Sequence, residues 1–273
     1  ITNTTDPSSK RVQIAPSTNS SQGINTLRVT GDLDISAGAG LTLAAGSELI
    51  VLGNLVDNNT SSGNVVLKSE SNRFSSLKVS GTSSGNFFKY QLFINDINPS
   101  GGGGWDLKGS PLDSATANGN NFASNSGSYA FQAFDNSTAS YTQQSTTGAI
   151  SAVNAKGYAA AKDNSQSGGT VAFTGQIQDS NTTIQVTNYV SSSGDKKQFN
   201  LIANPFSTFI AANNTARDAS DATGSVIYKN ALATGDDVMG HADGEDVIWA
   251  WNGTSYSTIT NAGSASFLAP GQG

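Results

Sequence analysis

Cysteine is absent from this chain of 273 residues, and histidine occurs only once. No disulfide and no thiolate metal site can therefore form. The single histidine, His241, lies in a Gly-flanked stretch with no Gly-x-Ser-x-Gly elbow nearby. We therefore expect this histidine to be inert and the chain to have no catalytic triad.

Charged residues are also scarce, at 12% of the chain against about 25% in a typical globular domain. The formal net charge is −6 and no run of Lys and Arg occurs, which argues against a nucleic-acid partner. No apolar run approaches the roughly 18 residues of a membrane span, so we expect no membrane insertion. Gly, Ser, Thr, Asn and Ala replace the charged residues, and they favour strands and turns over long helices.

One short phrase is written three times, as Leu27–Gly31, Leu49–Gly53 and Leu77–Gly81. The copies are 22 and 28 residues apart, and in the first two the phrase continues with Asp or Asn and then Leu. Repeats at such a spacing are typical of stacked coils, in which each coil buries its apolar face on the next. The phrase therefore predicts a stacked β architecture for residues 24–84.

Apolar residues in this repeat region alternate with polar ones, as at Leu41 and Leu43, which indicates strands with one buried face. Gly, Asp, Asn and Ser separate the apolar pairs and are typical of corners. We predict a short parallel β-helix of about three coils with two short strands per coil, in which Asp32 and Asn54 stack at one corner. The alternative is a meander of hairpins with coincidental similarity between the copies.

The rest of the chain carries a different pattern. Residues 85–104 include an aromatic-rich strand, and residues 105–273 contain short strands at intervals of roughly 8–12 residues with turn signals between them. This spacing predicts an antiparallel, jelly-roll-like β-sandwich. The expected fold class is therefore all-β, with an extended arm or linker at 1–23 that includes a candidate strand at Arg11–Ala15, β-helix-like repeats at 24–84 and a β-sandwich module at 85–273.

Five phrases follow one another over this second half. They are Trp105–Pro111, Lys156–Tyr158, Gly169–Gly175, Asn200–Phe206, and Ile248–Gly253 with the closing Leu268–Gly273. In this order they resemble a β-sandwich module common in secreted proteins of the phylum Bacteroidetes, those exported by the type IX secretion system. Asp106 stands where the module usually has His, and Lys108 where it has Ile. The module's closing aromatic strand does not follow Gly273.

The resemblance implies a large exported protein, attached to the cell surface or released, of which this chain is a fragment. The first residue, Ile1, and the abrupt end at Gly273 agree with a fragment. The resemblance also implies a stalk-like role for the repeats at 24–84. The module is not tied to one catalytic activity, and its role is usually taken as structural or adhesive. We therefore expect an extracellular or cell-surface location.

The densest carboxylate cluster lies close to His241. It consists of Asp236, Asp237, Asp243, Glu245 and Asp246. Calcium takes about six to eight oxygen ligands from such loops, so a structural calcium ion is the one cofactor that the sequence suggests. The order of the carboxylates does not fit an EF-hand, and a solvated acidic loop is the alternative.

Two further kinds of surface site are predicted. Trp249 and Trp251 alternate along one strand and share a face, so they are candidates for sugar stacking as well as for burial in the sandwich. Ser114 and Ser180 each follow an Asp, and both sites resemble the Asp-Ser/Thr-x signal for O-glycosylation in this phylum. They are therefore candidate glycosylation sites.

Three hypotheses of function follow. The first is a non-enzymatic extracellular structural or adhesive protein: a surface stalk, an adhesin segment or a filament subunit. Its partner would be a second copy, joined by strand exchange through the arm at 1–23, or a surface glycan. The second is a carbohydrate-binding accessory region of a secreted polysaccharide-degrading enzyme. The third, a catalytic domain, is not expected, because paired carboxylates need a long groove and three coils are too short to form one.

Overall fold

The computed structural model describes residues 11–14, 25–96, 104–117, 122–145, 150–162, 170–184, 186, 189–190, 196–197, 199–213, 215–216, 247–252, 255–260 and 263–273. Within these residues all regular structure is β, which confirms the all-β prediction. The described ranges also contain no helix with the length and apolarity that a membrane crossing requires.

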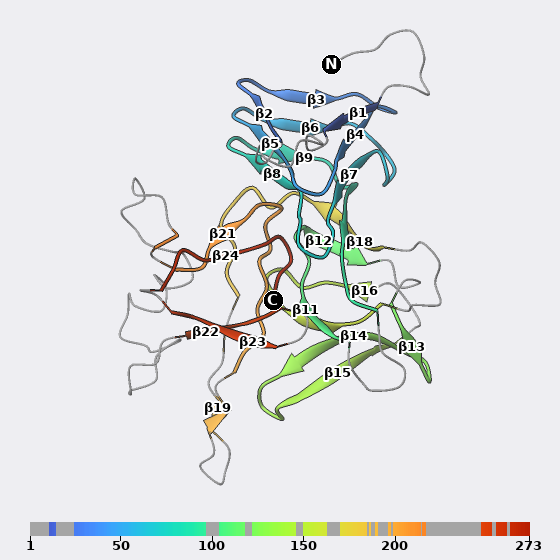
Figure 1. Ribbon diagram of the computed structural model, residues 1–273. Helices are drawn as coiled ribbons and strands as arrows, with labels where there is room; N and C mark the ends of the chain where they lie inside the picture. Colours follow the sequence, from blue (N-terminus) through green and yellow to red (C-terminus); the bar gives the residue numbers. More distant parts are fainter. Residues whose placement is uncertain are drawn as a thin grey trace.

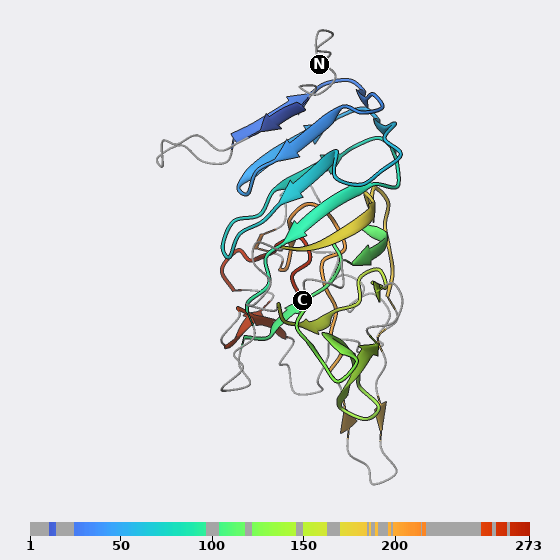
Figure 2. The same ribbon diagram turned by 90° about the vertical axis from the view of Figure 1, so that its right-hand side faces the viewer.

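The described residues from 11 to 84 form three successive coils, and each coil gives one strand to each of three sheets (Figure 2). The strands are, coil by coil, β1 (Arg11–Ile14), β2 (Asn25–Val29) and β3 (Leu33–Ile35); β4 (Gly40–Leu43), β5 (Ser47–Val51) and β6 (Leu55–Asp57); β7 (Val65–Lys68), β8 (Ser76–Val79) and β9 (Ser83–Ser84). Each strand pairs in parallel with its counterpart in the next coil. We call residues 11–14 and 25–84 the coil stack.

Two details of the coil stack differ from the expectation. Each coil has three strands rather than two, because a corner at Gly followed by Asp, Asn or Thr separates two short strands that follow each other closely in the sequence. A meander of hairpins would make antiparallel pairs, whereas all pairs between coils here are parallel. The candidate strand at Arg11–Ala15 is present as Arg11–Ile14, but it belongs to the first coil and pairs with β4 of the same chain instead of forming part of an arm.

The repeated phrase sets the register of the coil stack. Leu27 pairs with Leu49, and Leu49 pairs with Leu77. Leu49 and Leu77 are buried, while Leu27 of the first coil is 38% exposed. The second interval between copies is six residues longer than the first, 28 against 22, and the extra residues lie in the connections before and after β7. The spacing therefore changes without any change of register.

The corner that follows each phrase is held by a ladder of side chains. Asp32 Oδ1 accepts the backbone N–H of Asn54 at 2.7 Å, as the predicted stacking of these two residues requires. Asn54 Oδ1 in turn accepts the backbone N–H of Thr82 at 3.0 Å. Each side chain thus satisfies a backbone donor of the following coil, which turn residues leave free.

The first sheet of the coil stack continues beyond it. Its order is β1-β4-β7-β10-β18-β12-β16, and the added strands are β10 (Phe88–Leu92), β12 (Asp113–Ala117), β16 (Ile150–Ser151) and β18 (Val171–Gln176). β10 pairs in parallel with β7 on one side and antiparallel with β18 on the other. The sheet therefore changes from parallel to antiparallel at β10, which lies between the labelled strands β7 and β18 of Figure 1.

A second, antiparallel sheet contains β11 (Asp106–Lys108), β13 (Ser124–Asn125), β14 (Ser128–Asp135), β15 (Ser140–Ser145) and β17 (Tyr158–Ala160). The two sheets share a core. Phe131 of β14 stacks on Tyr158 with 4.2 Å between the ring centroids and lies 6.1 Å from Phe173 of β18. We call residues 85–273, as far as they are described, the second module.

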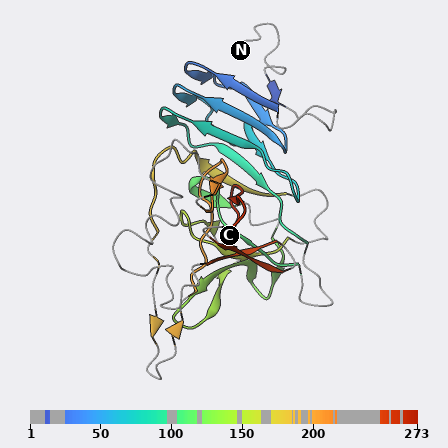
Figure 3. The same cartoon turned by 60° about the vertical axis from the view of Figure 1, so that its left-hand side comes forward.

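Three short antiparallel pairs complete the described strands. They are β19 (Tyr189–Val190) with β20 (Lys196–Lys197), β21 (Ile210–Ala211) with β24 (Phe267–Leu268), and β22 (Val247–Trp251) with β23 (Tyr256–Thr260). The segment before β21 returns to the coil stack, where Ser207 accepts the N–H of Leu77 at 2.8 Å and donates its hydroxyl to the Leu77 carbonyl at 2.9 Å. Figure 3 shows these strands, in orange and red, beside the two large sheets.

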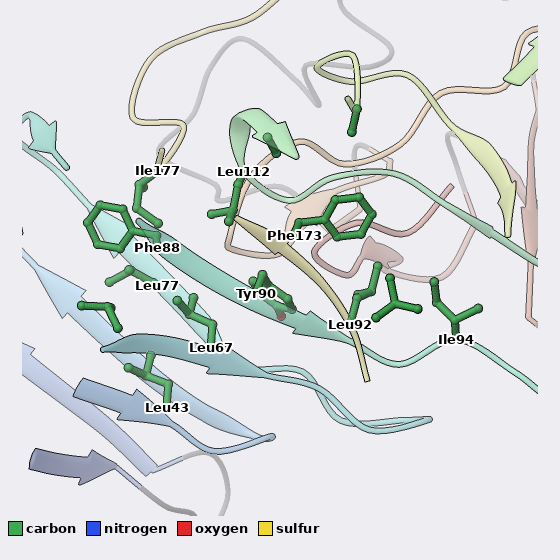
Figure 4. Close-up of a cluster of buried hydrophobic side chains, with 14 of the residues drawn as sticks. Leu43, Leu67, Leu77, Phe88, Tyr90, Leu92, Ile94, Leu112, Phe173 and Ile177 are labelled. Atoms are coloured by element: carbon green, nitrogen blue, oxygen red, sulfur yellow. The ribbon is translucent and has the colours of Figure 1, made fainter. Parts of the chain in front are cut away.

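One hydrophobic core runs through both parts of the molecule (Figure 4). It passes from Leu43 and Leu67 of the coil stack through Tyr90 of β10 to Leu112 and Phe173. Each of these five side chains is fully buried. The core therefore crosses the boundary expected between residues 84 and 85 without interruption.

The coil stack also contains a buried carboxylate, Asp57. One of its oxygens accepts the backbone N–H and the side-chain N–H of Asn59, at 3.2 and 2.6 Å. The other oxygen is buried with no hydrogen-bond partner among the described residues. Burial is the largest influence and raises the pKa of Asp57 above its ordinary value, while the two bonds from Asn59 lower it.

We expect Asp57→Asn to raise the free energy of unfolding at pH 7 by about 1 kcal/mol, because an amide avoids the cost of a buried, half-paired charge. Since the folded pKa lies above the unfolded one, the contribution of Asp57 to stability is complete below about pH 4 and is lost as the pH rises through the folded pKa. The variant should therefore lose less stability than the wild type above about pH 4. Urea denaturation across this pH range measures the difference, with the exposed Asp34→Asn as control; identical pH profiles for D57N and the wild type would contradict it.

Candidate functional site: an aromatic groove

A groove of about 320 Å³ opens on the second module, on the outer face of the second sheet. It is lined by Trp105, Leu107, Gln132, Tyr141, Ala159, Trp251 and Tyr256. These residues come from β11 and the position before it, from β14, β15 and β17, and from the β22–β23 hairpin. We call this set of seven residues the aromatic groove.

The floor of the groove follows from strand register. Leu107 of β11 pairs with Ala159 of β17, which pairs with Gln132 of β14, so the three side chains point to the same face. Ala159 is the middle residue, and its small side chain leaves a depression between Leu107 and Gln132. Tyr141 of β15 is paired with Phe134, two residues beyond Gln132, and therefore stands on the same face.

The β22–β23 hairpin supplies the other wall. The indole Nε1–H of Trp251 donates to the backbone carbonyl of Trp105 at 2.8 Å and fixes the hairpin against β11. Tyr256 pairs with Trp251 across the hairpin, and their ring centroids are 4.8 Å apart. Trp249 packs edge-on against Tyr256 at 6.5 Å and extends the aromatic surface beyond the lining.

The polar groups of the groove are neutral. None of its seven lining residues is charged; the amide of Gln132 and the hydroxyls of Tyr141 and Tyr256 are its side-chain hydrogen-bonding groups apart from the two indoles. Burial raises the pKa of the Tyr141 phenol, and the neighbouring Tyr256 raises it further. The phenol, which is protonated at neutral pH even at its ordinary pKa, therefore acts there as a neutral hydroxyl. The groove therefore offers hydrogen bonds and ring faces rather than an acid or base.

The two tryptophans predicted as sugar-stacking residues meet in this region. Trp251 lines the groove and is half-buried, whereas Trp249 is 51% exposed, so the alternative that both are buried in the sandwich is wrong. Sequence reasoning missed Tyr141 and Tyr256. Both belong to strands, but no periodicity in the sequence indicates that β15 and the β22–β23 hairpin lie next to each other.

The faces of β11 are divided between the groove and the interior. Asp106, which alternates with Trp105 and Leu107, is 4% exposed and accepts the backbone and side-chain N–H groups of Asn95 at 2.7 and 2.9 Å. Burial raises the pKa of Asp106, although the charge of Lys108 lowers it; burial lowers the pKa of Lys108. These two residues tie the strand to its neighbours and do not line the groove.

The structure brings the two candidate glycosylation sites together. Ser114 and Ser180 are exposed, and Ser114 has a φ of +49° at an irregularity of β12. The Asn154 amide donates to Asp113 at 3.1 Å and to Gln178 at 2.7 Å. The Gln178 amide in turn donates to Ser180. A network of side chains therefore links the neighbourhoods of both serines on one surface.

The remaining candidate residues fall elsewhere. The predicted calcium loop, together with His241, lies outside the described residues: Asp236, Asp237, Asp243, Glu245 and Asp246. The ranges that the structure does describe hold no group of three or more His, Asp or Glu side chains able to bind a metal ion. Carboxylates of the coil stack are engaged in hydrogen bonds within it: Asp32, Asp34, Glu48, Asp57 and Glu70.

Comparison with known proteins adds no relative. No protein-family model, no curated protein and no solved structure matches this chain. The resemblance to the type IX-exported module therefore stays a prediction.

Proposed function

We propose that this chain is a non-enzymatic extracellular protein of structural or adhesive type, in which a short parallel β-helix carries a jelly-roll-like β-sandwich. One observation supports this proposal above the others: β10 is hydrogen-bonded both to β7 of the coil stack and to β18 of the second module. The two parts share a sheet and a core instead of being joined by a linker alone. Such a continuous body suits a protein that holds a binding surface at a fixed distance from its support.

Further bonds brace the same junction. Asp179 accepts the backbone N–H of Ser83, and it accepts the Ser83 hydroxyl at 3.0 Å. The Ser83 hydroxyl also lies within bonding distance of the Ile177 carbonyl, at 3.1 Å. The Ser207–Leu77 bonds described above lie on another side of the coil stack. Bending at the junction would break several of these bonds together.

Rigidity is tested first, by spin labelling. Because the chain has no cysteine, the exposed Ser36 and Ser255 can be changed to cysteine and labelled without background. Pulsed electron paramagnetic resonance should give one narrow distance distribution, as narrow as that of a control pair at Ser36 and Ser61 within the coil stack. A broad or two-peaked distribution for the Ser36–Ser255 pair would contradict a rigid body.

Adhesion is tested second, on beads that carry the chain through its N-terminus. We expect these beads to resist flow on glycan-coated surfaces longer than beads that carry an unrelated β protein, or the purified chain to form filaments under the electron microscope. A chain that does neither would contradict a structural or adhesive role.

The second candidate is a carbohydrate-binding accessory region of a secreted polysaccharide-degrading enzyme. The specific observation that favours it is the aromatic groove, which holds Trp251 and leaves Trp249 exposed beside it. This candidate predicts that the chain binds the polysaccharide that its enzyme degrades.

Three further proposals come from the sequence. Ser114 and Ser180 are proposed O-glycosylation sites, which mass spectrometry of the native protein checks. A structural calcium ion is proposed for the acidic loop near His241, which a comparison of melting temperatures with calcium and with a chelator checks. Strand exchange between copies would require Arg11–Ile14 to leave β4 of its own chain and pair with a second copy, which the oligomeric state of the full chain checks.

A further inference from the structure

We propose that the aromatic groove binds a neutral, pyranose-containing glycan, with a sugar ring against its indole and phenol rings. This inference deepens the adhesive function proposed above and rests on it for the presence of glycans around the protein. Tyr141 and Tyr256 are 40% and 52% exposed, so a ligand can reach ring surface there without any rearrangement of the chain. The volume of about 320 Å³ lies at the lower end of ligand sites and suits about one or two sugar rings.

The shape of the groove matches the two surfaces of a pyranose. A sugar ring presents a face of C–H groups, which packs against the electron-rich face of an aromatic ring, and an edge of hydroxyls. Trp251 and Tyr256 form such an aromatic wall, and Leu107 and Ala159 form an apolar floor. Ligand sites of this kind combine a largely apolar lining with a few placed polar groups.

The polar groups of the groove match a hydroxyl-bearing ligand. The Tyr141 hydroxyl can donate and accept, and the Gln132 amide also does both. Sugar hydroxyls also donate and accept, so each can meet either kind of group. Because no lining side chain is charged, an anionic or cationic ligand would lose hydration without gaining an ion pair.

A proline-rich peptide is the other ligand that aromatic grooves bind. Such a peptide is held by stacking and by donors that reach its carbonyl groups. The Gln132 side-chain oxygen is an acceptor that finds no donor on proline residues, which lack an N–H, whereas a sugar hydroxyl can donate to it. The observations therefore favour a sugar over a peptide, and the peptide becomes an outcome of the test.

The groove is also built before any ligand arrives. The Trp251–Trp105 bond joins residues that are 146 positions apart and fixes the hairpin on the sheet. The Tyr141 ring packs against Phe134 with 5.3 Å between centroids. Rings that are already held in place lose little freedom on binding, which favours affinity.

The experiment titrates the full chain with neutral hexasaccharides of β-glucan, mannan, xylan and chitin, up to about 10 mM, a range that covers weak sites. Decaproline and a heparin hexasaccharide are the comparison ligands. Tryptophan fluorescence and calorimetry report binding. We expect saturable binding of at least one neutral hexasaccharide and none of decaproline or heparin. Failure of every neutral sugar, or preferential binding of decaproline, would overturn the proposal.

Variants then place the binding in the groove. Tyr141→Ala and Trp251→Ala should each weaken binding by about tenfold or more, as expected for the loss of one stacked ring. Ala159→Leu should block binding by filling the floor while keeping every aromatic ring. Tyr141→Phe removes one hydroxyl and should weaken binding by about threefold to tenfold. Circular dichroism confirms that each variant is folded.

The matched control is Phe267→Ala. Phe267 is 52% exposed, as Tyr256 is, but it lies on β24 and does not line the groove. Its affinity should equal that of the wild type. Equal weakening by Phe267→Ala, or undiminished binding by both Tyr141→Ala and Ala159→Leu, would overturn the assignment. If no neutral sugar binds while the beads still adhere, the assignment of the groove is wrong but the adhesive function is not. A broad distribution of spin-label distances would contradict the proposed function separately.

Discussion

Replacing Phe131 by Ala is expected to lower the free energy of unfolding by about 4 kcal/mol, the range seen when a buried aromatic ring leaves a cavity. Phe131 is fully buried at the centre of the second module. Its ring touches three others, those of Phe122 at 4.9 Å, Tyr158 at 4.2 Å and Phe173 at 6.1 Å between centroids. These rings come from different strands and loops, so no single shift closes the cavity. Urea denaturation followed by fluorescence measures the loss.

The control for this prediction is again Phe267→Ala, which removes a ring of the same size from an exposed position. It should change the free energy of unfolding by less than about 0.5 kcal/mol. A loss below about 1.5 kcal/mol for Phe131→Ala would contradict the tight packing described here. Because the core is continuous, circular dichroism and tryptophan fluorescence should report one common transition in the wild type.

The repeat region shows which part of the fold the sequence can predict. The stacking of Leu27, Leu49 and Leu77 follows from their identical phrases, because an apolar residue in one coil finds the same residue in the next. The pairing of Asp32 with the Asn54 backbone follows for the same reason. Only two strands per coil were predicted: Leu33 and Ile35 alternate and mark β3, but β6 and β9 carry no such pair, so the third strand does not recur as a pattern.

The groove could be predicted only in part. Trp251 was identified because two tryptophans alternate on one strand, a local pattern. Its contact with Trp105 joins positions 146 residues apart and depends on how the hairpin folds back over β11. The depression at Ala159 depends on the register of three strands, which no local pattern reveals.

Irregular segments held by buried asparagines were also beyond sequence reasoning. The Asn204 amide donates to the carbonyls of Thr208 and Leu268, and its oxygen accepts the N–H of Phe206 at 2.9 Å. Asn213 is completely buried, and its amide donates to the carbonyls of Thr260 and Ser264. From the sequence alone such residues are expected at the surface, because asparagine is mostly exposed and the composition does not show which asparagines are buried.

The glycines of the repeated phrase lead to the second large effect. A Cβ atom at Gly53 would lie 2.6 Å from the carbonyl carbon of Gly31 and 2.7 Å from the nitrogen of Asp32, closer than real Cβ contacts. At Gly81 it would lie 2.7 and 2.8 Å from backbone atoms of Gly53. At Gly31 it would meet no atom of the described residues within 4 Å. Gly31, Gly53 and Gly81 occupy equivalent positions and therefore differ only in whether a preceding coil packs against them.

We expect Gly53→Ala to lower the free energy of unfolding by about 3 kcal/mol, the upper part of the range for overpacking, because two of the three nearest atoms it meets are backbone and cannot turn aside. The coils would have to separate, which weakens the Gly53 N–H bond to Gly31 at 3.2 Å and the Asn54 bond to Asp32 at 2.7 Å. Gly31→Ala should instead be neutral or stabilising by about 0.5 kcal/mol, since its φ is not positive and alanine reduces the entropy of the unfolded chain. Urea denaturation of both variants measures the difference. Equal losses of stability for Gly31→Ala and Gly53→Ala would contradict the prediction, because they would mean that each glycine is needed for its own corner and not for the contact between coils.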